Sequence, residues 1–336
     1  MTRQLLRPRY LLWLVVPFLF VWVLRGVSLG DVWATLSKLG PAQLLALALA
    51  NVLVLITLSG RWWSILRAQR HPASYPSLVG YRLAAFGVSY FTPGPQFGGE
   101  PLQVYLLQRH HQVPRATAIA AVALDKSLEL LANFAFLTGG VICILQCRVS
   151  PGLVARPAML FVIALLAVPA GLLLALWAGR RPVSGLLRAT SRLVPQRWVP
   201  RQGRASDHPG IHQAIQASED QATRLVREHP RAIGAALGFS LISWAAILGE
   251  YWLALYFLGQ SLTLAQAISA LTAARIAFLL PVPGGLGALE ASQVLALSAM
   301  GMDPAVGLSL SLLIRVRDVA LGGLGLWWGG LKSELL

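Results

Sequence analysis

Six long apolar runs constrain the fold of this chain more than any other feature. A helix needs about 20 apolar residues to cross a bilayer, and each run is about that length or longer. Charged residues make up only 12% of the chain, whereas ordinary soluble domains contain roughly 25%. The sequence therefore predicts an all-α integral membrane protein, a single polytopic domain over residues 1–336, with transmembrane helices at residues 10–27, 42–60, 116–145, 157–178, 231–258 and 305–330.

Two further apolar segments, residues 77–107 and 265–299, are broken at the centre by proline and glycine. The first contains FTPGPQFGGEP at residues 91–101, and the second contains LLPVPGGLGALEAS at residues 279–292. An unpaired backbone N–H or C=O group is costly in hydrocarbon, so broken helices persist at membrane depth only where protein buries them or water fills a cavity. The two breaks therefore predict an internal cavity.

The distribution of basic residues predicts the orientation. Lys and Arg outnumber Asp and Glu by 28 to 13, and most of the excess lies between the apolar runs. This pattern is typical of cytoplasmic loops, and no basic stripe with interleaved aromatic residues indicates nucleic-acid binding. The first run has a basic flank and no small-residue cleavage site, which predicts an uncleaved signal anchor. We expect a multi-pass protein of the cell inner membrane with both termini cytoplasmic, and a basic cytoplasmic loop at 180–230 containing a surface helix.

The same counting places both ends of each broken segment on one side of the membrane. Segment 77–107 is expected to enter and leave from the cytoplasm, and segment 265–299 from the outside. Each segment would then be a re-entrant hairpin of two half-helices. The predicted fold class is six transmembrane helices plus two re-entrant hairpins.

The spacing within the two broken segments indicates an internal duplication. Pro93 precedes Glu100 by seven residues, and Pro283 precedes Glu290 by seven residues. Hairpins that enter from opposite faces are the arrangement expected of an inverted-topology repeat. The predicted repeats are residues 42–145 and 231–330.

The half-helices after the breaks predict an anion site. Each begins near a glycine, and its first N–H groups have no partner within the helix and lie at the positive end of the helix dipole. Glycine lets a ligand approach the backbone closely, as at phosphate-binding helix N-termini. The predicted ligand is an anionic phospholipid or polyprenyl-phosphate lipid. The residues assigned to these breaks are Pro93, Gly94, Gly98, Gly99, Pro283, Gly284, Gly285 and Gly287.

Charged residues inside the apolar segments complete the set of candidates, and each has two interpretations. A carboxylate in the first turn of a half-helix either serves the site or is favoured there by the helix dipole. Charges within one turn of each other either serve the site or neutralise one another. An arginine either faces the cavity or extends toward the interface, which is the expectation for Arg82. Glu250 is either a proton relay or a partner of an arginine. The candidates are Glu100, Asp125, Lys126, Glu250, Arg275, Glu290, Arg315, Arg317 and Asp318.

The two motifs resemble those of a known family. TPGPQFGGEP with DKSLE downstream, and PVPGGLGALEAS with an arginine in the following span, resemble the lysylphosphatidylglycerol synthase transmembrane-domain family. That family includes the flippase-like membrane portion of the multiple peptide resistance factor. The resemblance covers most of the chain and implies translocation of lipids or lipid-linked intermediates. Pro95 stands where the family usually has glycine, and Gln103 stands where it usually has arginine.

The missing cation at Gln103 shifts the expected anion affinity to the last span. Asp125 and Arg315 lie 32 residues after the prolines of their motifs, so the two halves are expected to present opposite charges to one cavity. Arg315 is then expected to contribute most to anion binding.

The function predicted from these features is a lipid flippase or transporter, and the alternative is a membrane-embedded transferase acting on a lipid-linked phosphate. We expect no enzyme activity, because the chain contains no DxD pair and no Walker loop. Relatives that make aminoacyl lipids carry a soluble transferase domain after the membrane part, so synthesis by this polypeptide alone is not expected. No metal or other cofactor is expected, since no histidine lies inside an apolar run. The protein partners considered are a second copy of the chain and a lipid-synthesis enzyme.

Overall fold

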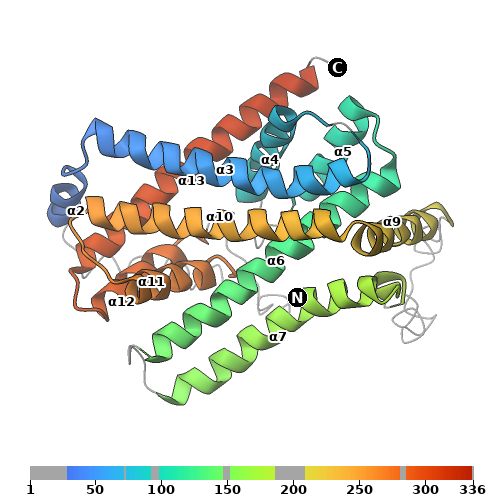
Figure 1. Cartoon of the computed structure of the whole chain (residues 1–336). Helices are drawn as coiled ribbons and strands as arrows, with labels where there is room; N and C mark the ends of the chain where they lie inside the picture. Colours follow the sequence, from blue (N-terminus) through green and yellow to red (C-terminus); the bar gives the residue numbers. More distant parts are fainter. Residues whose placement is uncertain are drawn as a thin grey trace, which may run out of the picture.

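The computed structural model describes residues 29–71, 73–91, 98–146, 152–185, 209–280 and 285–334. These residues form helices joined by short loops, with no β-strand among them, which confirms the predicted all-α class (Figure 1). The helices are α2 Leu29–Leu36, α3 Pro41–Ala68, α4 Tyr75–Phe91, α5 Glu100–His111, α6 Arg115–Gln146, α7 Gly152–Trp177, α9 Pro209–Glu228, α10 Pro230–Phe257, α11 Leu264–Ala277, α12 Ala288–Ser298 and α13 Pro304–Glu334.

Four of these helices are long and apolar enough to cross a membrane. They lie at Pro41–Ala68, Arg115–Leu145, Met159–Trp177 and Pro230–Phe257, where the sequence predicted spans. Large apolar side chains on their outer faces are exposed, as expected for helices surrounded by lipid. The span predicted at residues 10–27 lies outside the described residues.

The last predicted span, residues 305–330, lies within α13, a continuous helix of 31 residues. Its length is sufficient to cross a bilayer, but its middle contains Arg315, Arg317 and Asp318. α13 is therefore a long helix with a charged centre. Those charges have partners on neighbouring helices, which are described below.

A sequence of four helices occurs twice along the chain. The first group, α3 to α6, has helices of 28, 17, 12 and 32 residues. The second group, α10 to α13, has helices of 28, 14, 11 and 31 residues. Three of the four corresponding helices begin at the same spacing along the chain in the two groups. In the first group, α3, α4 and α6 begin at Pro41, Tyr75 and Arg115. In the second group, α10, α11 and α13 begin at Pro230, Leu264 and Pro304. α7 and α9 lie between the two groups.

The short helices end where proline and glycine were expected to break them. α4 ends at Phe91 and α5 begins at Glu100, whereas α11 ends at Ala277 and α12 begins at Ala288. We call α4 with α5 the first hairpin and α11 with α12 the second hairpin. The two hairpins lie toward opposite ends of the molecule (Figure 1).

The first helix of each hairpin packs against the last helix of the other group. α4 contacts α13 and α11 contacts α6, while α3 and α10 pack along their length. Glycine allows the first of these contacts to be close: a Cβ atom at Gly325 of α13 would overlap the backbone of Leu83 in α4. The second contact also depends on glycine, because a Cβ atom at Gly140 of α6 would overlap Thr272 of α11. Small residues at helix contacts are typical of membrane proteins.

Each group has its own apolar core. In the first group, Trp62, Leu107 and Leu128 are buried, and Leu225 of α9 joins them. In the second group, the buried residues include Leu255, Leu271, Leu289 and Leu310.

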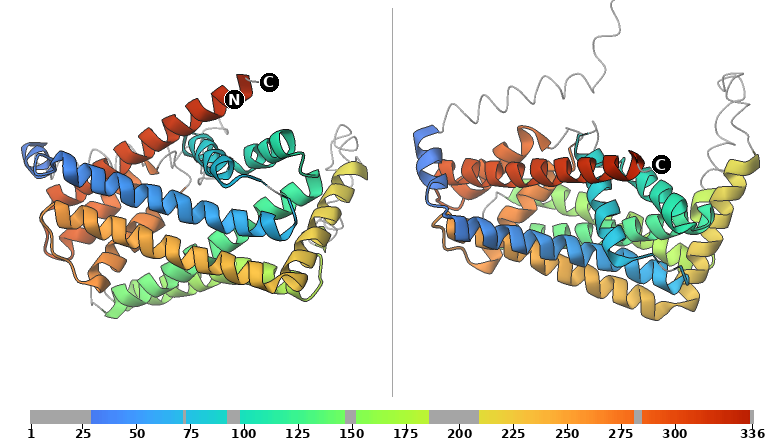
Figure 2. Two further views of the ribbon diagram at one scale, coloured as in Figure 1. Left: turned by 45° about the horizontal axis from the view of Figure 1, so that its top comes forward. Right: turned by 90° about the horizontal axis from the view of Figure 1, so that it is seen from above.

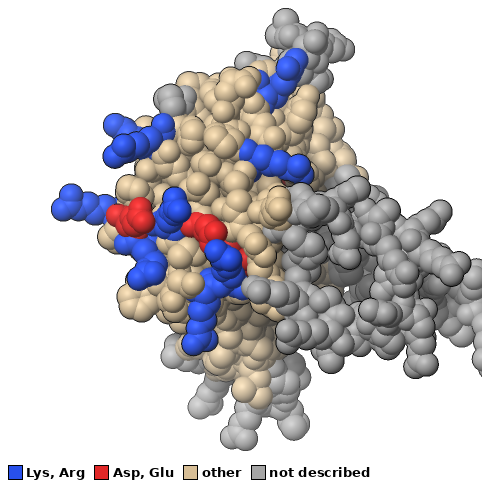
Figure 3. All heavy atoms as spheres, turned by 90° about the vertical axis from the view of Figure 1, so that its right-hand side faces the viewer, with Lys and Arg blue, Asp and Glu red and all other residues tan. Residues whose placement is uncertain are grey.

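The two ends of the molecule differ in charge. α2 lies at one end and α9 at the other (Figure 2), and we call the end with α9 the basic end. Several Lys and Arg side chains lie on this end, and fewer Asp and Glu side chains (Figure 3). α9, within the loop predicted at 180–230, buries Ala222 and Leu225 and exposes arginines. The exposed arginines of the basic end are Arg67, Arg70, Arg109, Arg115, Arg180, Arg181, Arg224, Arg227 and Arg231.

Candidate functional site

Buried and half-buried charges of the first group form a connected set, which we call the first charge cluster. Asp125 of α6 is its centre and is 4% exposed. Arg61 of α3 donates from Nε to Asp125 Oδ1 at 2.7 Å and from Nη2 to Oδ2 at 3.3 Å. Arg82 of α4 donates from Nη2 to Asp125 Oδ2. Two guanidinium groups from different helices therefore share one carboxylate. The cluster consists of Arg61, Arg82, Glu100, Asp125, Lys126 and Glu129.

Glu129 and Lys126 extend this cluster to the first hairpin. Glu129, one turn after Asp125, accepts from Arg61 Nη2 at 2.8 Å and from Lys126 Nζ at 2.9 Å. Lys126 Nζ also lies 3.1 Å from Glu100 Oε1, at the start of α5. The cluster therefore contains three cations and three carboxylates, and every member contacts a residue of opposite charge.

The second group holds a corresponding set, which we call the second charge cluster. Arg315 donates from Nε to Glu290 Oε1 at 2.8 Å, and its Nη2 donates to the same oxygen. Arg317 donates from Nη1 to Glu250 Oε1 at 2.7 Å and from Nε to Asp318 Oδ1 at 2.9 Å. These five residues bring together α10, α12 and α13.

Two polar contacts join this cluster to helices of the first group. Asn51 of α3 donates from Nδ2 to Glu250 Oε1 at 3.1 Å. Arg315 is also hydrogen-bonded to Tyr90, near the end of α4. The charged residues of the second group therefore lie where the two groups meet.

The two groups pair a carboxylate and a cation in the same way. Glu100 opens α5 and contacts Lys126 of α6; Glu290 is in the first turn of α12 and contacts Arg315 of α13. Lys126 and Arg315 occupy the same position in their helices, counted from the helix starts at Arg115 and Pro304. Arg315 therefore corresponds to Lys126 and not to Asp125. Counted from the starts of α3 and α10, Glu290 lies slightly farther along its group than Glu100 does. The spacing counted from the motif prolines therefore matched Arg315 with Asp125 instead of Lys126.

Arg275 of α11 is arranged differently from the cations of the two clusters. Its Cζ lies 4.9 Å from the centroid of the Trp244 ring. Trp244 is in turn stacked on Phe136, with ring centroids 4.3 Å apart. Among the described residues no carboxylate forms an ion pair with Arg275, whereas Arg315 already has Glu290. The two arginines therefore differ in their charge partners, and the expectation that Arg315 contributes most to anion binding stays a prediction.

The arginines of the first group correct two sequence-based interpretations. Arg82 was expected to extend toward the interface, but it is 8% exposed and contacts Asp125 and Glu129. Arg61 was not among the candidates, because it follows the predicted span 42–60 directly, where basic residues are expected outside the membrane. α3 continues to Ala68, so Arg61 lies inside the helix and is 1% exposed. The sequence did contain a signal for Arg61: it directly follows the apolar run 42–60, well before Arg67 and Arg70 near the end of the helix.

The glycines of the first break have roles within the protein itself. Gly98 has φ 143°, and its N–H donates to Glu100 Oε2 at 2.9 Å. The Gly99 N–H donates to Ser89 Oγ at 2.9 Å, and a Cβ atom at Gly99 would overlap the backbone of Ala85. Two N–H groups that were expected to face a ligand are therefore already bonded in this structure.

In the second break, Gly285 and Gly287 have φ values of 63° and 74°, in the left-handed region that favours glycine. The remaining residues assigned to the breaks lie outside the described residues: Pro93, Gly94, Pro283 and Gly284.

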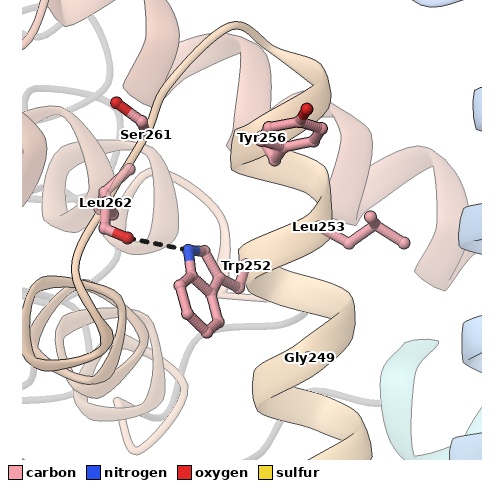
Figure 4. A pocket seen from close by; sticks show the side chains of 6 residues that line it. All are labelled: Gly249, Trp252, Leu253, Tyr256, Ser261 and Leu262. Atoms are coloured by element: carbon pink, nitrogen blue, oxygen red, sulfur yellow. Dashed lines mark hydrogen bonds between the residues drawn. The ribbon is translucent and has the colours of Figure 1, made fainter.

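A pocket of about 370 Å³ lies at the end of α10 and is lined by no residue of either charge cluster (Figure 4). It is open and mainly apolar, and Trp252 on its wall donates from Nε1 to the Leu262 carbonyl at 3.0 Å. None of the predicted site residues lines it. Within the described ranges, no group of three His, Cys, Asp or Glu side chains is placed to hold a metal ion. The residues that line the pocket are Gly249, Trp252, Leu253, Tyr256, Ser261 and Leu262.

Comparison with known proteins shows the family. Two UPF0104 membrane proteins of Methanothermobacter thermautotrophicus are similar to this chain. One is 20% identical in an alignment that covers 85% of this chain and 84% of the relative. The other is 26% identical in an alignment that covers 82% of this chain and 79% of the relative. A UPF0104 membrane protein of Methanocaldococcus jannaschii is 25% identical over 37% of each chain. The model of the lysylphosphatidylglycerol synthase TM region matches residues 11–324. This multi-pass, helical membrane protein therefore belongs to the lysylphosphatidylglycerol synthase TM region family.

Proposed function

We propose that this protein moves an anionic phospholipid or an isoprenoid-phosphate-linked lipid across the cytoplasmic membrane. The observation that supports this most is the pair of hairpins at opposite ends of the molecule, each with a carboxylate–cation pair at the start of its second helix. Buried charges are costly inside a bilayer and usually belong to a substrate or ion pathway. Family membership supports a lipid as the transported molecule.

The proposed architecture is an inverted repeat of six spans and two re-entrant hairpins. Its support is the recurrence of four helices whose starts are spaced alike in the two groups, together with the reciprocal packing of α4 on α13 and of α11 on α6. In transporters built this way, substrate sites lie near the bilayer midplane, where discontinuous helices of the two repeats meet.

Alternating access would then arise from motion of one group against the other. The ion pairs of the two clusters each lie within one group, as in Arg61–Asp125 and Arg317–Glu250. Contacts between the groups use close glycine packing and hydrogen bonds such as Asn51–Glu250. Such a division would let each group keep its charges paired while the interface between them changes.

Reconstitution in liposomes that contain fluorescent phosphatidylglycerol tests the function. We expect a membrane-impermeant reductant to bleach the fluorophore of both leaflets with the protein present and only the outer leaflet in its absence. Glu100→Gln should slow this exchange at least tenfold, because it removes the charge that faces Lys126 at the first hairpin. The control is Glu228→Gln, at the exposed end of α9, which should match the unmodified protein.

Two results would contradict the proposal. The first is bleaching of the outer leaflet alone by a correctly folded protein. The second is a chemically altered lipid detected by mass spectrometry, which would favour the membrane-embedded transferase.

The orientation is tested by cysteine labelling, after Cys143 and Cys147 are replaced by alanine. We expect Ser74→Cys and Arg109→Cys, at the two ends of the first hairpin, to react with an impermeant maleimide only from the cytoplasmic side. Their side is predicted by the exposed arginines of the basic end. At the second hairpin, Ser261→Cys and Ala299→Cys should react only from the outside. If the two positions of one hairpin react from opposite sides, that hairpin crosses the membrane and the proposed topology is wrong.

A further inference from the structure

Among the described residues, six cations lie inside the helix packing of the two groups. Five of them have a described carboxylate partner, and one does not. The five are Arg61, Arg82, Lys126, Arg315 and Arg317. Arg275 has no ion pair or hydrogen bond with a described residue. A guanidinium group has five N–H donors, and all of those on Arg275 are left without an acceptor by the described part of the chain.

The position of Arg275 favours an anion as its missing partner. It lies in the last turn of α11, beside the second break. The charged groups that act on it electrostatically are Arg317, Asp318, Glu250 and Glu129. Arg317 is already bonded to Glu250 and Asp318, and its side chain remains 34% exposed.

Trp244 holds the Arg275 side chain in place. A guanidinium group over an aromatic face is stabilised by the ring quadrupole, and Trp244 is itself fixed by stacking on Phe136. A cation–π contact uses the face of the guanidinium group and leaves the N–H groups at its edge free. Those edge donors match two oxygens of a phosphate group.

We propose that Arg275 binds the phosphate group of the lipid. This inference rests on the proposed function for its ligand and names the residue that recognises the head group. It assigns that role to Arg275 because the charge of Arg315 is already balanced by Glu290.

The competing role for Arg275 is that of a long-range counter-charge. The second charge cluster has three carboxylates and two arginines, so Arg275 makes the local total neutral without touching them. The two roles predict different behaviour of the protein without lipid. A counter-charge stabilises the protein at all times, whereas an unpaired binding residue contributes stability only when its anion is present.

The test measures binding of dihexanoyl phosphatidylglycerol to the purified full chain in a non-ionic detergent, together with the unfolding temperature with and without that lipid. We expect Arg275→Gln to weaken binding at least tenfold and to lose the stabilisation by lipid, while its unfolding temperature without lipid falls no more than that of Arg67→Gln, which also loses a cation–π contact. The matched control is Arg67→Gln, because Arg67 Cζ also lies 4.9 Å from a tryptophan ring centroid, that of Trp63, but at the exposed basic end. This variant should bind within twofold of the unmodified protein.

Two ligand controls identify the recognised chemistry. Dioctanoylglycerol, which lacks phosphate, should not bind in an Arg275-dependent way. If inorganic phosphate competes with the lipid for binding, the phosphate group alone is recognised. If binding of the lipid depends on Arg275 but inorganic phosphate does not compete, the whole lipid head group is needed. Either result supports the proposal.

Other outcomes would overturn it. These are binding by Arg275→Gln within twofold of the unmodified protein, equal binding of dioctanoylglycerol, or a lower unfolding temperature of the lipid-free variant with unchanged stabilisation by lipid. If Arg275→Gln does not fold, Arg275→Lys serves instead, because lysine keeps the positive charge but lacks the paired N–H donors of a guanidinium group. This variant should bind the lipid three- to tenfold more weakly. Unchanged affinity contradicts the assignment. Arg275-dependent binding without lipid exchange in liposomes would disprove transport and leave the phosphate site intact.

Discussion

Asp125→Asn is expected to lower the free energy of unfolding by about 3–5 kcal/mol, the range measured when one member of a buried ion pair is removed. Asp125 is 4% exposed and accepts from both Arg61 and Arg82. Without its charge, two guanidinium groups from α3 and α4 would be left with Glu129 as their remaining carboxylate contact. Chemical unfolding in detergent micelles, followed by circular dichroism, measures this change.

An exposed ion pair of the same chemistry provides the control. Arg181 and Asp220 form a two-bond pair, with both N–O distances 2.9 Å, at the basic end. Exposed pairs contribute roughly 0–1 kcal/mol, so Asp220→Asn should change the free energy of unfolding by about that amount. If Asp125→Asn and Asp220→Asn have equal effects, the first charge cluster does not hold α3, α4 and α6 together.

Gly325→Ala is the second large effect, and it has a control two residues away on the same helix. A Cβ atom at Gly325 would lie 2.6 Å from the backbone carbonyl carbon of Leu83 in α4. The backbone cannot rotate away as a side chain can, so α4 and α13 must separate. Overpacking of this kind costs about 1–3 kcal/mol and sometimes more, so we expect a loss at the upper end of that range.

A Cβ atom at Gly323 meets nothing within 4 Å. Gly323→Ala should therefore be neutral or raise the free energy of unfolding by up to about 1 kcal/mol, since alanine favours helix more than glycine does. Thermal unfolding of both variants in detergent gives the comparison. If Gly325→Ala and Gly323→Ala change the unfolding temperature in the same direction, the close packing of α4 on α13 is contradicted.

The helix breaks and the long helices were predictable because their causes are local. An apolar run of spanning length must satisfy its own backbone hydrogen bonds in lipid, which requires a helix; α3, α6, α7 and α10 are at the predicted places. Proline and glycine ended α4 and α11 for equally local reasons, because proline lacks an N–H and glycine disfavours helix. The resemblance to the family, carried by the two motifs, is confirmed over residues 11–324.

The pairing of charges depended on distance in space, which the sequence does not contain. Arg61 and Asp125 are 64 residues apart, and Asn51 and Glu250 are 199 residues apart. Sequence alone identified Glu100, Glu290 and Arg315 as charged residues within apolar segments, since an ionisable group there is costly wherever it lies. It could not show which of them are neutralised.

The sequence by itself determined that this chain is an all-helical membrane protein with two interrupted segments, because hydropathy and helix breaking act over a few neighbouring residues. Only the tertiary structure decided that Arg61 and Arg82 are buried, that Lys126 corresponds to Arg315, and that Arg275 stacks on Trp244 without a carboxylate partner in the described residues. The burial and partners of a charged side chain depend on which other helices pack against it, and that packing is set by contacts between segments far apart in the chain.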